Sequence, residues 1–179
     1  MSLRLFAALP VPEEIGAGLV RLQKGVPGAR WRPVENFHIT LRFFGEIDER
    51  TAEDLDAELA NIRMDPFTVR LRGAGWFGKA DPRALWLGVE AGEAVATLAG
   101  KCERAARRAG LKPETRNFHP HMTIAYLQGT PVDKANRFTQ RASDLETGAW
   151  MATHFSLYSS WITRGDANIY EAEADYPLA

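Results

Sequence analysis

Two histidines stand at the start of matching runs, and each is followed two positions later by a threonine. His38 opens HITLRF and His121 opens HMTIAY, so both runs read His, apolar, Thr, apolar, variable, aromatic. They lie 83 residues apart (121 − 38), close to half of the 179-residue chain. With four histidines and eleven threonines, chance predicts only about 0.25 His-x-Thr matches. The repeated flanks therefore indicate an internal duplication with two similar half-sites that face each other.

The chemistry that such a pair offers is acid–base catalysis without a metal. An unperturbed imidazole has a pKa of about 6.5, so at neutral pH one ring can be neutral and the other protonated. The neutral ring can accept a proton from water or a hydroxyl, and the charged ring can donate one to a leaving oxygen. Thr40 and Thr123 share a strand face with their histidines and can donate hydrogen bonds to non-bridging phosphate oxygens. The pattern predicts cleavage of a phosphoester.

The second run carries a further histidine of the same parity. In an extended NFHPHMTIAY segment, the side chains of His119, His121 and Thr123 share one face. The opposite face, which we expect to point into the core, carries Met122, Ile124 and Tyr126. The first run has Asn36 at the position equivalent to His119, and His154 is not followed by a threonine at the same spacing. We expect His119 and His154 to be structural, with a place near the substrate as the alternative for His119.

The elements that must position these residues alternate between strands and helices. Apolar runs and period-two alternation predict strands at residues 4–9, 38–44, 67–77, 84–90, 121–127, 151–163 and 168–176. Helical periodicity predicts helices at residues 12–25, 48–62, 93–110 and 130–142. The second helix has Asp48 or Thr51 as candidate N-caps, and its apolar side carries Leu55, Leu59 and Ile62. Several strands are joined by short turns such as GKADP and RGDAN, which favours an α+β fold with largely antiparallel sheets.

Composition and charge suit one soluble domain, or two small lobes that share a core. The chain is 45% hydrophobic and 25% charged, and its formal net charge of −1 gives no global field that draws it onto nucleic acid or a membrane. No apolar run approaches the roughly 20 residues of a membrane span. Cys102 is the only cysteine, which excludes an intrachain disulfide and Cys-rich zinc sites. We expect a cytoplasmic monomer in which residues 1–179 form a single domain.

Basic and aromatic residues give weaker signals for RNA. One basic cluster comprises Lys101, Arg104, Arg107, Arg108, Lys112 and Arg116. It could track a phosphate backbone, but Glu103 and Glu114 interrupt it, which favours a solvated helix face. Base stacking on an aromatic ring contributes roughly 1–3 kcal/mol per base. Three tryptophans could supply it, although we expect core packing for Trp31, Trp76 and Trp86.

The whole pattern resembles the 2H phosphoesterase superfamily, which is named for its paired His-x-Thr motifs. RWRPVENFHITLRFFGEI resembles the first-motif block of its RNA 2′,3′-cyclic phosphodiesterase (2′-5′ RNA ligase) branch, and FHPHMTIAY resembles the second. RLFAALPVP, PRALWLGVE and SLYSSWITRGDANIYEAEADYPL resemble its opening strand, middle hairpin and closing strands. The resemblance extends nearly from end to end of the chain.

This resemblance implies a fold and a reaction. The fold is two pseudo-symmetric lobes with outer helices, and the two motifs line a cleft between the lobes. The reaction opens a 2′,3′-cyclic phosphate on an RNA end or a nucleotide to a 2′-phosphate, with no metal and no cofactor. Some members also join or cleave 2′-5′ RNA linkages. The resemblance implies His38 as proton donor and His121 as proton acceptor, with Thr40 and Thr123 holding the phosphate.

One position departs from the family pattern. The second motif of that branch commonly has an arginine three positions after its threonine, where this chain has Tyr126. A phenol can donate one hydrogen bond to substrate but brings no charge at neutral pH. Arg42, which shares parity with His38, is one candidate for the missing charge, and Arg4 on the first strand is another. An exposed arginine with no part in the site is the alternative for each.

Three other functions stay open. His119 and His121 could form the His-x-His pair of a metal-dependent hydrolase, which needs at least a third ligand. A non-catalytic RNA-binding module would keep the cleft without needing His38. A 2H enzyme acting on another cyclic phosphate or on a 2′-5′ oligonucleotide would use the same two histidines, so mutating them cannot separate it from the main hypothesis.

Overall fold

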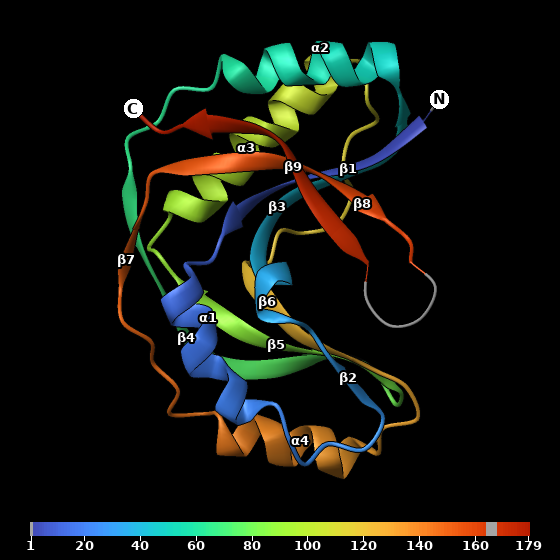
Figure 1. Cartoon of the computed structure of the whole chain (residues 1–179), viewed down its shortest axis with the longest axis vertical. Helices are drawn as coiled ribbons and strands as arrows, with labels where there is room; N and C mark the ends of the chain where they lie inside the picture. Colours follow the sequence, from blue (N-terminus) through green and yellow to red (C-terminus); the bar gives the residue numbers. More distant parts are fainter. Residues whose placement is uncertain (1, 164–167) are drawn as a thin grey trace.

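The computed structural model describes residues 2–163 and 168–179 and places their strands in two sheets (Figure 1). The four-stranded sheet has the order β3 (His38–Asp48), β1 (Ser2–Pro10), β8 (His154–Trp161) and β9 (Ile169–Pro177). The five-stranded sheet has the order β2 (Ala29–Trp31), β6 (His121–Leu127), β5 (Pro82–Glu90), β4 (Phe67–Gly78) and β7 (Trp150–Ala152). Neighbouring strands in both sheets are antiparallel, so the predicted α+β class is confirmed. Residues 164–167, in the RGDAN segment predicted as a turn, lie outside the described residues.

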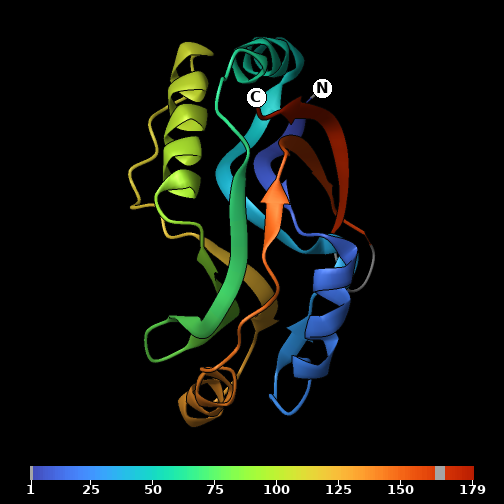
Figure 2. The ribbon, with the colours of Figure 1, turned by 90° about the vertical axis from the view of Figure 1, so that its left-hand side faces the viewer.

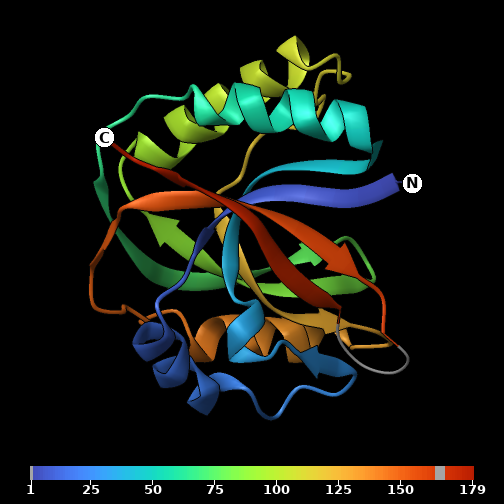
Figure 3. The same cartoon turned by 45° about the horizontal axis from the view of Figure 1, so that its top comes forward.

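Helices cover the two ends of the molecule. α2 (Glu49–Ala60) and α3 (Ala94–Arg108) lie side by side at one end, against the four-stranded sheet (Figures 1 and 3). α4 (Val132–Arg141) packs against β4 and β5 at the other end, where α1 (Glu13–Leu19) also lies (Figure 2). Short 3₁₀ turns follow α1 at Val20–Leu22 and precede β3 at Val34–Asn36. None of the helices in the described part of the chain is long and apolar enough to cross a membrane.

The bounds of α2 and α3 follow the signals in the sequence. The side chain of Asp48 accepts a hydrogen bond from the backbone N–H of Thr51 at 2.8 Å, so Asp48 is the N-cap of α2. The apolar side of this helix and the residue just after it are buried at Leu55, Leu59 and Ile62. α3 ends before Gly110, whose φ of +91° lies in the left-handed region that glycine adopts at little cost. Burial in α3 raises the pKa of the Cys102 thiol to about 12, which suits an inert core residue.

One segment that the sequence predicts as a single strand forms two strands. Segment 151–163 breaks at Thr153, between β7 and β8. β7 pairs with β4, whereas β8 pairs with β1 and β9, so the chain crosses here from the five-stranded to the four-stranded sheet. The prediction was wrong because the alternation of side chains continues across the crossing and does not reveal which strand is the partner. The sequence also gives no signal for β2, a three-residue strand beside β6.

Candidate active site

β3 and β6 place the two His-x-Thr motifs at one cavity. His38 and Thr40 come from the four-stranded sheet, whereas His121 and Thr123 come from the five-stranded sheet. All four residues line a cavity of about 1060 Å³. The alternating residues of the two strands are buried in the core: Ile39, Leu41, Met122 and Ile124. The structure therefore brings together the four residues that the sequence predicts to carry the reaction.

Each imidazole is oriented by a backbone carbonyl two residues upstream. Nδ1 of His38 lies 2.8 Å from the carbonyl oxygen of Asn36, and Nδ1 of His121 lies 2.6 Å from that of His119. A carbonyl oxygen can only accept, so each Nδ1 carries a proton and donates it. The Nε2 atom of each neutral ring is then the one that can accept or return a proton. The two half-sites thus share one hydrogen-bond pattern.

The two rings differ in proton affinity. Burial lowers the pKa of His38 to about 4; the Asn36 carbonyl opposes this effect, whereas positive charge on Arg32 and His121 adds to it. Burial also lowers the pKa of His121. The hydrogen bond to the His119 carbonyl opposes this decrease, whereas positive charge on the His119 ring adds to it. At neutral pH both rings are neutral in the empty cleft. The negative charge of a bound phosphate would raise both pKa values.

Tyr126 lies at the cavity and not in the core, which corrects the expectation from strand parity. Its side chain is 41% exposed and lines the same cavity as His121. Between Thr123 and Ala125, β6 has one residue more than the facing part of β5, which makes a β-bulge at Ile124. Ile124 and Ala125 are consequently both buried, and the following residue turns to the face of the motif.

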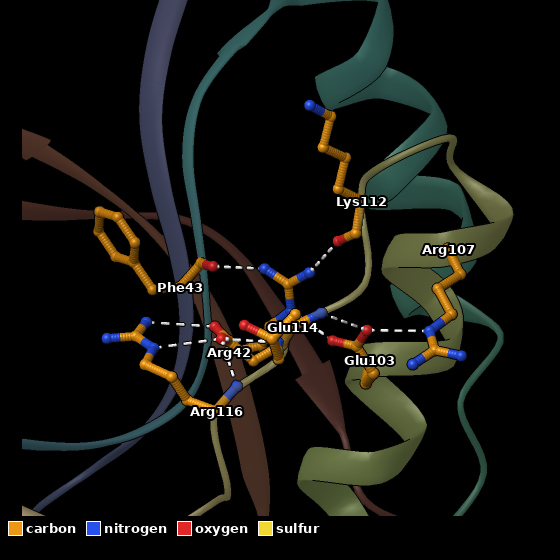
Figure 4. Close-up of polar contacts among 8 residues, drawn as sticks. Arg42, Phe43, Glu103, Arg107, Lys112, Glu114 and Arg116 are labelled. Carbon is orange, nitrogen blue, oxygen red and sulfur yellow. Dashed lines mark hydrogen bonds and ion pairs between the residues drawn. The ribbon is translucent and has the colours of Figure 1, made fainter.

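Neither predicted replacement arginine presents a free charge to this cavity. Nε of Arg42 forms an ion pair with Glu103 at 2.5 Å, and its two Nη atoms donate to the carbonyl oxygens of Phe43 at 2.6 Å and Lys112 at 2.7 Å (Figure 4). Arg42 lines the cavity, but all three of its guanidinium nitrogens already donate to groups of the protein. Arg4 is exposed on β1, with its guanidinium 5.3 Å from the ring centre of Phe43, and it does not line this cavity.

The contacts of Arg42 belong to a network that fixes the loop before β6 (Figure 4). Besides Arg42, the Glu103 carboxylate accepts from Arg107 Nε and from the backbone N–H of Glu114, each at 3.0 Å. Glu114 in turn accepts from the backbone and the side chain of Arg116. This loop supplies the wall of the cavity that leads to His121. Half of the predicted basic cluster is ion-paired, through Arg107 with Glu103, Arg108 with Glu58 and Arg116 with Glu114.

A third arginine at the cavity has no counterpart among the predicted residues. Arg32 directly follows β2, is only 7% exposed and lines the cavity beside His38. Its guanidinium carbon lies 5.0 Å from the ring centre of Tyr126 and 5.9 Å from that of Tyr170. Nη2 of Arg32 donates a hydrogen bond of 3.3 Å to the Tyr170 hydroxyl. The RWRP sequence offers no sign that its second arginine is buried, because that burial depends on rings from β6 and β9.

Aromatic rings stand beside both histidines. The ring centre of Phe6 lies 4.8 Å from that of His38, and Phe77 meets His121 edge-on at 4.8 Å. Partly exposed phenylalanines line the cavity and offer surfaces for a base at Phe43, Phe77 and Phe118. The cavity lining does not include the three tryptophans that were considered as possible surfaces for base stacking: Trp31, Trp76 and Trp86.

His119 does not extend the strand face of His121. β6 begins at His121, and His119 lies in the preceding loop, exposed but on the cavity wall. His154 begins β8 and does not line this cavity. In the described ranges 2–163 and 168–179, no three His, Cys, Asp or Glu side chains are grouped so that they could hold a metal ion. The His-x-His pair thus has no third ligand among these residues.

Comparison with known families finds the same two halves. The family model described as LigT like Phosphoesterase matches residues 9–86 and residues 87–166, so each match contains one His-x-Thr motif. A curated RNA 2′,3′-cyclic phosphodiesterase of Aeropyrum pernix is 36% identical over 146 residues, which cover 78% of this chain and 83% of the relative. A protein of the same name from Methanocaldococcus jannaschii is 30% identical over 176 residues, covering 94% and 97%.

Solved structures agree with this relationship. The crystal structure of E. coli LigT complexed with 3′-AMP superimposes with a TM-score of 0.82 at 26% identity, covering 99% of both chains. The predicted two-lobed arrangement with antiparallel sheets is confirmed by this match and by the two sheets described above. The resemblance stated from the two motifs is likewise confirmed.

Proposed function

The chain belongs to the LigT-like phosphoesterase family, and we propose that it opens 2′,3′-cyclic phosphates on RNA ends or nucleotides to give 2′-phosphates. The observation that carries this proposal is the matched pair of imidazoles at one cavity. Each ring is fixed through Nδ1 and keeps Nε2 for proton transfer, with a threonine hydroxyl on the same strand face. The names of its relatives, RNA 2′,3′-cyclic phosphodiesterases, agree in substrate class.

The proposed reaction is one displacement at phosphorus. His121 accepts a proton from the attacking water, and a bond forms from the water oxygen to phosphorus as the bond to the 3′ oxygen breaks. His38 donates a proton to the 3′ oxygen, which leaves as a hydroxyl. The hydroxyls of Thr40 and Thr123 donate to the non-bridging oxygens, where negative charge increases. His38 gains its proton on substrate binding, because the phosphate charge opposes the burial that lowers its pKa in the empty cleft.

Phosphorus NMR with adenosine 2′,3′-cyclic phosphate tests this function. We expect complete conversion to adenosine 2′-phosphate in excess EDTA, with the 3′-phosphate absent. A 3′-phosphate product would reverse the assignment of the leaving oxygen. Turnover that needs an added divalent metal would move the mechanism to the His-x-His alternative, and tight RNA binding without turnover would favour the non-catalytic module.

We also propose that residues 1–179 form a single bilobal domain that acts as a monomer in the cytoplasm. Buried residues of both sheets belong to one hydrophobic cluster, which supports a single folding unit. An RNA substrate suits the cytoplasm. Light scattering after gel filtration tests the oligomeric state, and a dimer mass at micromolar concentration would contradict the proposal.

A further inference from the structure

Arg32 is a buried cation without an acidic partner in the described part of the chain. The residue is only 7% exposed, and charged residues are rarely buried to this extent unless they are paired. No carboxylate of the described residues lies within 4.0 Å of its guanidinium. The hydrogen bond that its side chain donates to Tyr170 is long at 3.3 Å. A buried charge of this kind indicates that an anion completes the site.

The guanidinium is held in place before any ligand arrives. The rings of Tyr126 and Tyr170 come from β6 and β9 and contact it by cation–π interactions. Among the described residues the guanidinium donates a hydrogen bond only to Tyr170, so its other N–H groups have no hydrogen-bond partner there. The backbone of Arg32 is also fixed, because its N–H donates to Ile124 at 2.9 Å and its carbonyl accepts from Gln23 at 2.7 Å.

The other arginines at the cavity are already engaged. Three arginines line it within the described chain: Arg32, Arg42 and Arg116. Arg42 is paired with Glu103 and Arg116 with Glu114. Arg32 is the one of the three that has no carboxylate partner among the described residues. It is also close enough to His38 for its charge to oppose protonation of that ring.

We propose that Arg32 binds the non-bridging oxygens of the substrate phosphate in this chain and supplies the positive charge that Tyr126 does not. This inference rests on the proposed function for the identity of the anion. The rigid fork of N–H donors in arginine matches phosphate oxygens, and burial away from water strengthens their attraction. Arg32 precedes the first motif, so its charge lies in the His38 half of the cleft. Tyr126, which stands where the family commonly has an arginine, lies in the His121 half.

Calorimetric titration with inorganic phosphate and with adenosine 2′-phosphate tests this role without catalysis. Hydrogen bonds to charged groups contribute about 1.5–3 kcal/mol, so we expect Kd to rise roughly 10- to 100-fold in R32Q. The matched control is R30Q, which removes the same charge from an exposed residue of β2 that does not line the cavity. Its Kd should change less than about threefold. Because no turnover is measured, failure of the cyclic phosphodiesterase assay would leave this result interpretable.

A second variant separates anion binding from folding. The Tyr126 ring lies 5.0 Å from the Arg32 guanidinium, so an arginine side chain at position 126 can reach the same region. We expect R32Q/Y126R to recover phosphate affinity to within about threefold of the wild type. Wild-type affinity in R32Q, or an equal loss in R30Q, would overturn the proposal. So would a double variant with wild-type thermal stability and the weak binding of R32Q.

Discussion

The two half-sites of the cleft share a hydrogen bond but differ in what surrounds it. His38 is deeply set beside Phe6, with the charge of Arg32 nearby, and the Asn36 carbonyl that holds it belongs to a short helical turn. His121 is shallower and takes its carbonyl from a loop. The side chain of Asn36 donates a hydrogen bond to the carbonyl of Asn168, which precedes β9. The loop before β6 is instead held by hydrogen bonds, from the backbone N–H of Glu114 to Glu103 of α3 and from Arg42 of β3 to the carbonyl of Lys112. The two half-sites therefore share the same hydrogen bond to Nδ1, while their surroundings lower the pKa of His38 more than that of His121. The donor role of His38 consequently depends on the charge of a bound phosphate, which raises its pKa.

Loss of either imidazole is expected to have the largest effect. H38A and H121A should each lower kcat at least about 100-fold, the usual scale for a general acid or base. H154A is the control, because His154 does not line the cavity. Steady-state hydrolysis of adenosine 2′,3′-cyclic phosphate measures all three. Near-normal turnover in H38A or H121A would contradict the proposal that the two histidines act together as acid and base.

Stability at acid pH should distinguish the two rings next. The pKa of His38 is about 4 in the folded protein and about 6.5 in the unfolded chain, so the unfolded state takes up the proton first as pH falls. This contribution is fully present above pH 6.5 and is lost as pH falls through 4, by on the order of 3 kcal/mol in total.

Urea unfolding of H38Q at pH 7, 5 and 4 in phosphate-free buffer measures that contribution. The variant should lose less stability than the wild type between pH 7 and pH 4. Identical pH slopes in H38Q and the wild type would contradict the burial argument. Titration of the imidazole resonances should give a lower pKa for His38 than for His121.

The threonine hydroxyls should contribute about equally in the two halves. T40V and T123V keep the shape of the side chain but remove one donor to the phosphate, which should lower kcat/KM roughly tenfold each. T40S and T123S retain the hydroxyl and should stay within about threefold of the wild type. A large loss in only one valine variant would show that a single half-site holds the phosphate.

The smallest effect is expected from the network that joins the loop before β6 to α3 and β3. R42M removes the contacts from β3 to Glu103 and to the carbonyl of Lys112. We expect a loss in kcat of about threefold, a shift in the Nδ1 resonance of His121 and an unchanged resonance of His38. R70M is the control, because it removes another arginine–glutamate pair whose two residues do not line the cavity. Equal shifts at both histidines would contradict the separate support of the two halves.

Local sequence signals were sufficient for the motif pair and for much of the fold. The spacing of His38 and His121, with threonines at the same offset, predicted a shared site because strand parity is a local property. The N-cap at Asp48 and the end of α3 before Gly110 also depend on a few neighbouring residues.

The features that sequence reasoning missed depend on partners distant in the chain. The bulge at Ile124, which turns Tyr126 into the cavity, arises from pairing with β5. The break at Thr153 exists because two different sheets take up the flanking strands. Arg42 was a candidate for phosphate binding because it shares strand parity with His38, yet it forms an ion pair with Glu103 and a hydrogen bond to the carbonyl of Lys112. Arg32 is buried, and the rings that it contacts come from two other strands.

The most direct test of separate donor and acceptor half-sites uses a 2′,3′-cyclic phosphate analogue with sulfur in place of the 3′ oxygen. A thiolate leaves without a proton from the enzyme, so it removes the need for His38 but not for the acceptor His121. We predict that H38A hydrolyses this analogue within about tenfold of the wild-type rate, while H121A stays at least about 100-fold impaired. Equal impairment of both variants, or rescue of H121A instead, would contradict the assigned roles.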